Sequence, residues 1–354
     1  MDKLVYREDM PIPRPLAGEV LIRVAACGLN NTDLNTRVGW YGSSVASGMT
    51  FDLAIHGLPS DAADMSSWDR KSLHFPLIQG AAAAGTIVDV GAGVDPSRVG
   101  QRVVIDPVVR SPDLPLGARG VQYVGSERDG GYAEFLVVPT ENALRVAGDL
   151  DFKRLSTLPC AYQTAEEMQI RADVQPPDTV VVTGASGGVG LANVQLAKLR
   201  GATVIAICSR SKQDRVRRHG ADEVLAREDG PVSTQLSALL GDRGANVILD
   251  VVGTDDVATL WSLLARGGRY ATGGAIAGPF ARVDLRDLIY KDLKVFGIAN
   301  PEPQAMRNLV SYVEDGRLAP VVDKTFPLKD LAQAQREFAH KEHVGKIVIE
   351  IASN

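Results

Sequence analysis

A glycine-rich stretch, TGASGGVG at Thr183–Gly190, is the first feature of the sequence that could do chemistry. It follows the apolar run Thr179–Thr183, and after it come a helix-length segment, Gly188–Arg200, and a second apolar run, Thr203–Cys208. Glycines let the backbone approach a pyrophosphate, and the start of a helix offers amide groups and a positive dipole end to it. Because strand, turn, helix and strand come in the required order, the stretch predicts a dinucleotide site rather than a turn kept only for packing.

The end of the second strand bears on which dinucleotide binds. An NAD site places an acidic residue there, roughly 20 positions past the turn, to bond the ribose hydroxyls. This chain instead has Ser209, Arg210 and Lys212, and its first carboxylate is Asp214. A hydroxyl, a guanidinium and an ammonium suit a 2′-phosphate, so we predict NADPH. The alternative is that Arg210 and Lys212 are the solvated start of a helix.

Alternating strands and helices must position this turn. Further apolar strands are expected at Asn246–Val252, Gly268–Thr272 and Leu293–Gly297, with helix-length stretches between strands. Strand, helix and strand in this order predict a doubly wound parallel sheet, an α/β domain over residues 151–324.

The first part of the chain has a different sequence pattern. Short β-rich runs, such as Glu19–Ala26, Gly85–Val90 and Gln101–Ile105, are separated by turns rich in proline and glycine. This pattern is typical of a barrel-like β domain, which we place at residues 1–150. The last strand, Gly345–Ile351, is expected to return to it, so residues 325–354 join the same domain.

Composition narrows the possible partners. The chain has 354 residues, enough for two domains, with 38 basic against 43 acidic residues. A mildly acidic balance argues against nucleic acid or an anionic membrane as the main partner. The 3 cysteines are widely spaced, and the start, MDKLVYREDMPIP, lacks the pattern of a signal peptide. We therefore expect a cytoplasmic protein.

Taken together, the motifs resemble those of the medium-chain dehydrogenase/reductase superfamily over nearly the whole chain. Besides the glycine turn and the closing GKIVIEI, the resemblance rests on CGLNNTD (Cys27–Asp33), DGGYAEFLVVP (Asp129–Pro139) and LPCAYQTA (Leu158–Ala165). It implies a GroES-like β-barrel catalytic domain built from both chain ends, a Rossmann cofactor domain inserted between them, and an active site in the cleft.

The run IQGAAAAG stands where zinc-dependent members of this superfamily carry a Gly-His-Glu, and the histidine there is a metal ligand. Here those positions are Gly80, Ala81 and Ala82, and the resemblance matches the other ligand positions to Asn30 and Cys160. One thiol cannot hold a zinc ion, which needs four ligands. We predict no metal site. The alternative is a rebuilt site that uses two histidines close by in the sequence, at positions 56 and 74.

The metal-free branch, the quinone oxidoreductases and 2-enoyl thioester reductases, has an N-x-x-D…G-x-Y pattern that resembles Asn30, Asp33 and Tyr41 here. The resemblance implies that Tyr41 is the proton donor and that Thr32 occupies the hydroxyl position of the alcohol dehydrogenase proton relay. A phenol can supply a proton to an oxyanion that develops after hydride transfer. The alternatives are that Tyr41 only packs against Trp40 and that Thr32 caps a turn; Asn30 and Asp33 are expected to shape the loop.

The loops after the strands of the parallel sheet should line the dinucleotide, because an open α/β sheet binds its ligand at the carboxyl edge. Thr164 joins them because it matches the family position near the nicotinamide. The predicted cofactor-binding residues are Thr164, Ser186, Gly187, Gly188, Val189, Gly190, Ser209, Arg210, Lys212, Val252, Gly253, Gly274 and Asn300.

An insertion of about residues 42–75 separates Tyr41 from the alanine run and carries Met49, Phe51, His56, Met65 and Trp68. Long loops in compact domains are usually functional or disordered. We expect a lid over the active site; the alternative is a surface excursion or an oligomer contact.

These observations predict a metal-independent NADPH-dependent oxidoreductase that transfers hydride to a quinone or to an activated C=C bond of an enone or enoyl compound. Two alternatives stay open: an alcohol dehydrogenase or carbonyl reductase of the same superfamily, and an NADPH-binding sensor without turnover. Resemblance to family members that pair the strand matching Leu293–Gly297 across two subunits implies a homodimer.

Overall fold

The computed structural model describes residues 1, 3–43, 45–58, 65–67, 71–111, 121–253 and 257–351. Contacts divide the chain into two compact units. Unit 1 comprises Met1–Val45, Met49–Cys160 and Glu302–Asn354, and unit 2 comprises Ala46–Gly48 and Ala161–Pro301. No helix in the described part of the chain is long and apolar enough to cross a membrane.

The borders of these units differ from the predicted domain limits at 150 and 325. The stretch after 150 belongs to unit 1 because it packs closely there: a Cβ on Gly28 would lie 2.6 Å from the carbonyl oxygen of Ser156. Helix α10 (Pro303–Glu314) belongs to unit 1 as well, and its Glu314 accepts a hydrogen bond from the amide of Ala147 at 2.6 Å. Neither contact follows from a local pattern.

Unit 2 contains a six-stranded sheet in the order β10-β9-β8-β11-β12-β13, in which every neighbouring pair is parallel. The predicted doubly wound parallel sheet is confirmed, and its strand order is that of a dinucleotide-binding fold. Its strands are β8 (Thr179–Val182), β9 (Thr203–Cys208), β10 (Glu223–Ala226), β11 (Ala245–Asp250), β12 (Leu264–Thr272) and β13 (Lys294–Gly297).

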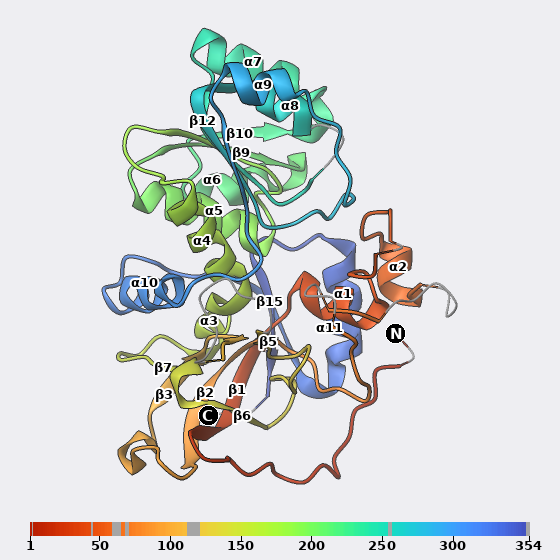
Figure 1. Ribbon diagram of the computed structural model, residues 1–354, viewed down its shortest axis with the longest axis vertical. Coiled ribbons are helices and arrows are strands. Elements are labelled where there is room, and N and C mark those ends of the chain that lie inside the picture. Colours follow the sequence, from red (N-terminus) through yellow and green to blue (C-terminus); the bar gives the residue numbers. More distant parts are fainter. Residues whose placement is uncertain are drawn as a thin grey trace. The chain divides into compact units, whose positions relative to one another are not determined.

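One helix precedes the first strand of this sheet, and the others connect its successive strands (Figure 1). They are α4 (Gln163–Arg171), α5 (Gly188–Leu199), α6 (Gln213–Arg218), α7 (Val232–Leu240), α8 (Val257–Ser262) and α9 (Leu285–Tyr290), with 3₁₀ turns η4 (Arg210–Lys212), η5 (Arg227–Asp229) and η6 (Gly241–Arg243). The central strands β8, β9 and β11 are short apolar runs that are mostly buried, and Val181, Ile205, Ile248 and Trp261 lie in one core cluster.

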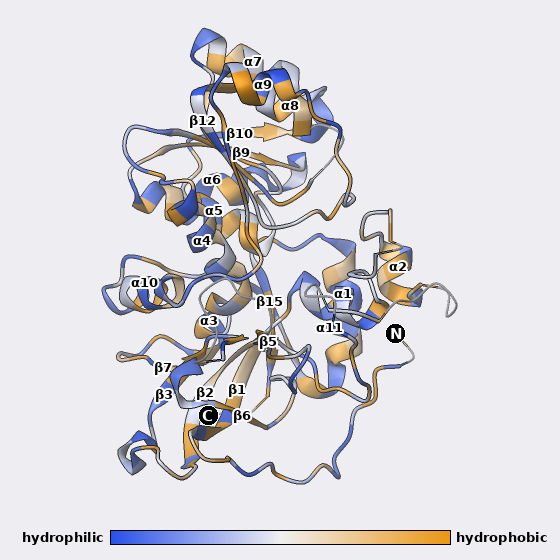
Figure 2. Cartoon of the chain, in the orientation of Figure 1, coloured by the Kyte–Doolittle hydropathy of each residue, from blue (hydrophilic) through white to orange (hydrophobic). Residues whose placement is uncertain are grey.

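Unit 1 is built on a seven-stranded sheet in the order β14-β15-β1-β2-β3-β7, with β6 paired to β1. Figure 2 shows the apolar character of β1 and β2, at the centre of this sheet. The strands are β1 (Glu19–Gly28), β2 (Ala82–Val90), β3 (Arg102–Ile105), β6 (Phe135–Pro139), β7 (Ala143–Arg145), β14 (Val322–Pro327) and β15 (Lys346–Glu350); β4 (Val108–Val109) and β5 (Gln122–Tyr123) form a separate pair.

Short helices complete unit 1. They are α1 (Asn31–Val38), α2 (Phe51–His56), α3 (Phe152–Leu155), α10 and α11 (Leu331–His340), with 3₁₀ turns η1 (Pro96–Arg98), η2 (Thr140–Asn142) and η7 (Leu328–Asp330). A kinked segment, η3 (Leu158–Tyr162), spans the border between the units. As predicted, the last strand joins the sheet of the first domain, where β15 pairs with β1.

The alanine run leads into β2, which begins at Ala82, and all four alanines are buried. Small residues are required because the segment Gly130–Tyr132 crosses directly over them, with the amide of Gly131 bonded to the carbonyl of Gly80 at 2.7 Å. A Cβ on Gly131 would come within 2.6 Å of the Cβ of Ala83. The alanine run therefore lies where two chain segments, the run itself and Gly130–Tyr132, cross in close contact.

Helix α2 of the insertion is anchored in unit 1. Ala54 of α2 lies in the main core cluster, its carbonyl accepts from Arg37 at 2.6 Å, and Phe51 stacks on His340 with ring centroids 4.3 Å apart. Residues 59–64 and 68–70, with Trp68, lie outside the described residues. The lid over the active site stays a prediction.

Candidate active site

The predicted catalytic segment sits at the end of β1, where the chain turns into α1. The carboxylate of Asp33 accepts a hydrogen bond from the amide of Asn30 at 2.8 Å, and the side chain of Asn30 donates to the carbonyl of Gly28 at 3.0 Å. Asn30 and Asp33 are both buried. They therefore shape the start of the helix, as the sequence predicted, through the reciprocal contacts typical of helix N-termini.

Tyr41 and Thr32 are brought together by the end of the same helix. Gly39 adopts φ 74°, a left-handed conformation that stops α1 and turns the chain back. The hydroxyl of Tyr41 then donates to Oγ1 of Thr32 at 3.2 Å. Burial raises the pKa of Tyr41 to about 12, so the phenol carries its proton at neutral pH. Tyr41 also packs edge-on against Trp40, 5.8 Å between ring centroids, so it has both a hydroxyl partner and the packing contact that the alternative reading expected.

A lysine that the sequence analysis did not single out lies beside this segment. Lys346 of β15 is 2% exposed, and its ammonium donates to the carbonyl of Leu29 and to Oδ1 of Asn30. Within the described chain, no carboxylate lies within ion-pair distance of it. Burial lowers its pKa to about 8, against the opposing effects of Cys160, Asp33 and Cys27.

Asp33 is the anionic counterpart of this lysine. Its Oδ2 accepts from the Tyr132 hydroxyl at 2.7 Å and from the amide of Asn30, whereas its Oδ1 has no hydrogen-bond partner among the described residues. Burial raises the pKa of Asp33, although Tyr132, Asn30 and the charge of Lys346 oppose the shift. Asn30 thus bridges a buried carboxylate and a buried ammonium.

Cys160 closes the cluster. Its backbone has φ 63° and ψ −71°, a conformation that a residue with a side chain rarely adopts. Burial raises the pKa of its thiol, whereas the Lys346 ammonium and a hydrogen bond from Tyr123 lower it. The cluster of Asn30, Asp33, Tyr132, Cys160 and Lys346 therefore holds its charges in a dry, crowded environment.

In unit 2, the glycine turn lies between β8 and α5, as predicted. Gly184 has φ 56°, and a Cβ on Gly190 would come within 2.2 Å of the Gly184 carbonyl oxygen, so both positions require glycine. Gly187 precedes α5 without a side-chain cap, which leaves the first amides of the helix for an anion. Ser186, Gly188 and Val189 belong to the same turn and helix start.

The loops after β11 and β12 lie together in unit 2. The carboxylate of Asp250 accepts from the amides of Val252 and Gly253 at 2.9 and 3.1 Å, and from the Tyr270 hydroxyl at 2.5 Å. Thr183 donates to it as well. The carbonyl of Val252 in turn accepts from the amide of Ala277 at 2.9 Å. Asp250 thereby fixes the backbone of two predicted cofactor residues.

Two further residues predicted to bind the cofactor, Thr164 and Gly274, lie near the turn after β12. A Cβ on Gly273 would lie 2.6 Å from the methyl of Thr164, and Gly274 accepts a hydrogen bond from the Thr272 hydroxyl at 3.0 Å. Farther along, Asn300 follows β13, and its buried Oδ1 has no hydrogen-bond partner among the described residues. The role of Thr164, Gly274 and Asn300 at a nicotinamide ring stays a prediction.

At the end of β9, the residues predicted to read the 2′-phosphate form η4. The guanidinium of Arg210 pairs with Asp229, and its amide donates to Glu228 at 2.9 Å. Ser209 precedes the turn and Lys212 ends it. Two acidic residues thus contact Arg210, and its role toward a 2′-phosphate stays a prediction.

The sequence analysis did not identify Lys346 or Tyr132 as site residues. It also did not predict that the Asp250 carboxylate holds the loop of Val252 and Gly253. Lys346 and Tyr132 stand inside motifs that supported the resemblance, GKIVIEI and DGGYAEF. The available signal was a single lysine in an otherwise apolar strand, which predicts either an exposed edge or a buried, partnered charge. Its partners Leu29 and Asn30 lie more than 300 residues away, and no local pattern connects them.

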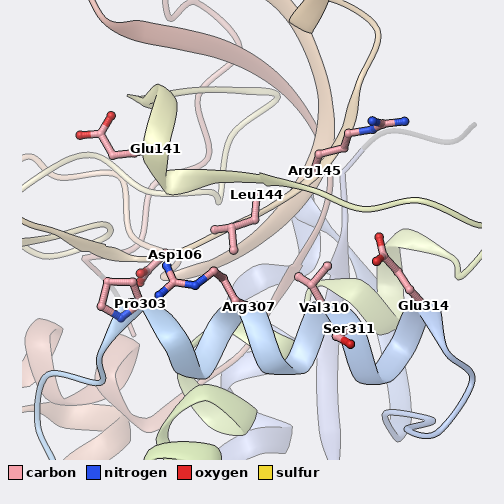
Figure 3. Close-up of a pocket in the computed structure, with 9 residues that line it drawn as sticks. All are labelled: Asp106, Glu141, Leu144, Arg145, Pro303, Arg307, Val310, Ser311 and Glu314. Atoms are coloured by element: carbon pink, nitrogen blue, oxygen red, sulfur yellow. The ribbon is translucent and has the colours of Figure 1, made fainter.

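Unit 1 also has a surface pocket of about 380 Å³ between β7 and α10. Figure 3 shows Leu144 of β7 above the helix, Arg307 directed toward Asp106, and Glu314 at the far end of α10. Its lining mixes acidic and basic side chains, and none of the predicted site residues is among them. The predicted catalytic residues lie elsewhere in unit 1.

Two family profiles match the chain. Residues 16–148 match the family described as alcohol dehydrogenase GroES-like domain, and residues 188–315 match the one described as zinc-binding dehydrogenase. The buried cluster does not fit a zinc ion. Ala81 has no donor atom, the oxygen of Asn30 already accepts from the Lys346 ammonium, and a cation so placed repels another. Among the described residues, no three His, Cys, Asp or Glu side chains converge as metal ligands.

Relatives cover nearly the whole chain. Quinone oxidoreductase of Rattus norvegicus is 26% identical over 98% of this chain and 93% of its own length. NAD-dependent alcohol dehydrogenase of Sulfurisphaera tokodaii is 26% identical over 97% and 95%. A Sinorhizobium meliloti protein of known structure, described as a candidate alcohol dehydrogenase, is 41% identical with a TM-score of 0.88, covering 99% of this chain and 94% of that one. The chain is an oxidoreductase that belongs to the medium-chain dehydrogenase/reductase superfamily.

Proposed function

We propose that this chain is a metal-independent, NADPH-dependent reductase of quinones or of activated C=C bonds in enone and enoyl compounds. The observation that carries the proposal is the hydroxyl pair of Tyr41 and Thr32, 3.2 Å apart, beside a cluster that offers no zinc site. Reduction of an electron-poor acceptor needs a proton donor for the developing oxyanion and can proceed without a Lewis acid.

Tyr41 is the proton donor in this proposal. Its pKa of about 12 keeps the phenol protonated, so the proton is available when negative charge develops on the acceptor. The O–H bond then breaks, and the proton goes to the oxygen of the reduced quinone or, in an enolate, to its oxygen or its α-carbon. The hydroxyl of Thr32, which accepts from Tyr41 at rest, can turn and donate to the resulting phenolate.

The residues of unit 2 hold the dinucleotide in this proposal. A bound NADPH would supply the hydride. The uncapped start of α5 and the Gly187–Gly190 backbone would bind its pyrophosphate, and Ser209, Arg210 and Lys212 its 2′-phosphate. Asp250 would hold the loop of Val252 and Gly253 against it. The free Oδ1 of Asn300 would accept from the carboxamide.

The experiment is to follow NADPH oxidation by chelator-treated protein with an ortho-quinone and an α,β-unsaturated ketone as parallel acceptors. We expect turnover of one of them, and the ratio of rates identifies the acceptor class. Tyr41→Phe keeps the ring against Trp40 and removes only the hydroxyl, so we expect kcat to fall about a hundredfold with the Kd of NADPH unchanged. Tyr6→Phe, at an exposed tyrosine, is the matched control.

Other outcomes would redirect the proposal. Reduction of simple ketones alone would indicate a carbonyl reductase or alcohol dehydrogenase, in keeping with the names of two relatives. Tight NADPH binding with no turnover of any acceptor would indicate a sensor. Full activity of Tyr41→Phe would exclude Tyr41 as the donor.

We also propose a homodimer formed through β13. Among the strands that the structure describes, β12 is its one neighbour, and the residues of β13 are largely exposed. Apolar side chains surround it, with Val295 42%, Ile289 62% and Tyr290 72% exposed. A second copy of the edge strand would cover them, which is how exposed edges are commonly protected.

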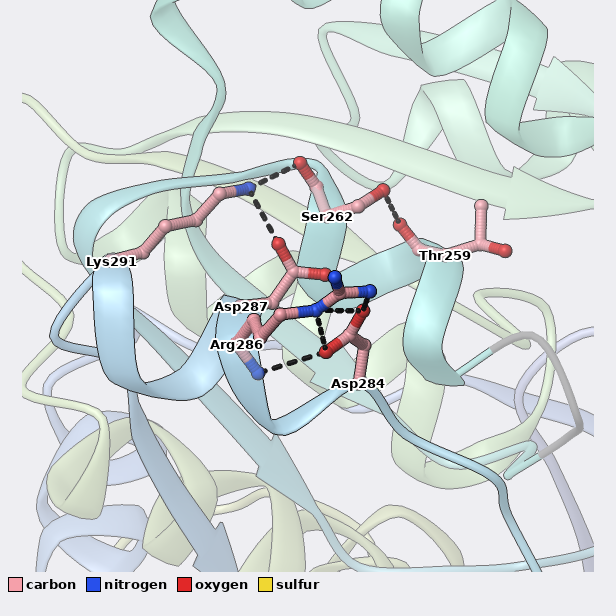
Figure 4. A network of polar contacts seen from close by, with 6 residues as sticks. All are labelled: Thr259, Ser262, Asp284, Arg286, Asp287 and Lys291. Carbon is pink, nitrogen blue, oxygen red and sulfur yellow. Dashed lines mark hydrogen bonds and ion pairs between the residues drawn. The ribbon is translucent and has the colours of Figure 1, made fainter.

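Polar contacts hold α9, which carries Ile289 and Tyr290 (Figure 4). Lys291 donates to the carbonyl of Ser262 at 2.6 Å and pairs with Asp287 at 3.6 Å, and Arg286 pairs with Asp284 at 2.6 Å.

Light scattering during gel filtration should give the mass of a dimer, and Val295→Lys should give a monomer. The control Val99→Lys, at an exposed valine of unit 1, should stay dimeric; a monomeric wild type would exclude the dimer.

A further inference from the structure

Two turns of opposite charge character lie side by side in unit 2. The strands β9 and β10 are parallel neighbours, with Cys208 opposite Ala226 at their ends. Each strand is followed closely by a 3₁₀ turn, η4 after β9 and η5 after β10. The turns therefore emerge from the same edge of the sheet.

Arg210 is held by η5. Its amide donates to the carboxylate of Glu228 at 2.9 Å, and its guanidinium forms an ion pair with Asp229. The side chains of Arg210 and Asp229 are 64% and 45% exposed, respectively, so both groups are accessible to a ligand. Other basic residues are close: Lys212, Arg217 and Arg227 all act on the Cys208 thiol and lower its pKa, although burial raises it overall.

A 2′-phosphate and Asp229 need the same guanidinium. The phosphate must displace the carboxylate from Arg210 or bind beside it, and a carboxylate at that place repels a dianion. The ribose hydroxyls of NADH carry no charge and meet no such repulsion. The acidic turn thus opposes one dinucleotide more than the other.

We propose that Asp229 is a specificity-determining residue that competes with the 2′-phosphate of NADPH for Arg210. It acts through Arg210 and lowers the ratio of NADPH affinity to NADH affinity. Without Asp229, the residues Ser209, Arg210 and Lys212 would give a higher ratio. This inference rests on the proposed use of a nicotinamide dinucleotide in unit 2.

The test is the affinity for the two reduced dinucleotides, measured by their fluorescence in wild-type protein and in Asp229→Asn. We expect Asp229→Asn to tighten NADPH about fivefold to tenfold and to leave NADH within about twofold, since it removes an exposed ion pair and a repulsive charge. Asp229→Glu keeps the charge and should behave as the wild type. Asp292→Asn, which breaks the exposed pair with Arg266 in the same unit, is the matched control and should change neither affinity.

A double variant shows whether the effect passes through Arg210. In an Arg210→Gln background, the gain from Asp229→Asn should disappear. An unchanged NADPH affinity in Asp229→Asn would overturn the inference. So would a several-fold loss of NADH affinity, because Asp229 would then be a ligand of the ribose hydroxyls.

The outcomes separate this inference from the proposed function. If the wild type binds only NADH and Asp229→Asn admits NADPH, the competition is supported although the NADPH assignment fails. If both proteins bind NADPH equally and reduce a quinone or enone with it, the proposed function is supported and the competition is wrong. If neither protein binds NADPH, both are wrong.

Discussion

Asp33 in unit 1 and Asp250 in unit 2 are two carboxylates, each 1% exposed, that are solvated in different ways. Each accepts a hydrogen bond from a tyrosine hydroxyl, at 2.7 Å from Tyr132 and at 2.5 Å from Tyr270. Asp250 also has Thr183 and two amides, so both of its oxygens are satisfied. Asp33 has one further amide, and its Oδ1 has no partner among the described residues.

The difference teaches how a buried charge is tolerated. Around Asp250, neutral donors fully replace water, and the carboxylate serves to hold a loop. Around Asp33, the replacement is incomplete, and a buried ammonium, Lys346, supplies part of the compensation through space. We infer that Asp250 is a fixed structural anchor, whereas Asp33 and Lys346 form a pair whose charge state depends on pH.

The largest expected effect is at the anchor. Asp250→Ala leaves the hydroxyls of Thr183 and Tyr270 and two amides without their acceptor, so we expect it to lower the free energy of unfolding by about 3–5 kcal/mol. Chemical denaturation at neutral pH measures it. The control Asp242→Ala, at an exposed aspartate of the same unit, should cost less than about 0.5 kcal/mol. If Asp250→Ala and Asp242→Ala lowered the free energy of unfolding equally, Asp250 would not be a structural anchor.

The second prediction concerns the charge of Lys346. Its pKa falls from 10.5 in the unfolded chain to about 8 in the fold, so the unfolded state binds more protons between these values. The free energy of unfolding should therefore rise with pH across this window, by on the order of 3 kcal/mol relative to Lys346→Met, which cannot titrate. Below pH 8 the cost of burying the ammonium is fully present. Lys294→Met, at an exposed lysine, is the control; curves for Lys346→Met that stay parallel to the wild type would contradict the prediction.

The smallest expected effects compare the two tyrosines directly. Tyr132→Phe leaves Asp33 with a single amide donor, whereas Tyr270→Phe leaves Asp250 with three donors. We expect losses of about 2 kcal/mol and about 1 kcal/mol in the free energy of unfolding, respectively. Denaturation of the two variants under one condition measures both. The reverse order would mean that Asp33 is the better solvated of the two.

Local patterns predicted most of unit 2. The strand β9 has the predicted bounds, Thr203–Cys208, and the glycine turn precedes α5 as expected, because a βαβ unit is written in about thirty consecutive residues. In unit 1 the segment of Asn30 to Asp33 and the pairing of Thr32 with Tyr41 also lie close in sequence. The alanine run could not be interpreted locally, since its size limit comes from Gly131.

The remaining contacts join distant segments. Lys346 meets Asn30 across the pairing of β15 with β1, and Asp229 meets Arg210 across the pairing of β10 with β9. Sequence patterns indicate that such strands exist, but the register that brings these side chains together depends on the whole sheet. Charge neighbours were therefore the least predictable part of the site.

The crossing of Gly131 over Ala83 limits the routes by which this chain can evolve. A side chain longer than a methyl at position 83, or any side chain at 131, meets the other segment at once. Accommodating it would move the backbone next to Tyr132, and with it the hydroxyl that Asp33 depends on. Single substitutions in the alanine run are thus expected to change the pKa of Asp33, about fifty residues earlier in the chain. A bulkier or metal-binding residue in the alanine run would therefore have to be accompanied by changes in the segment Gly130–Tyr132.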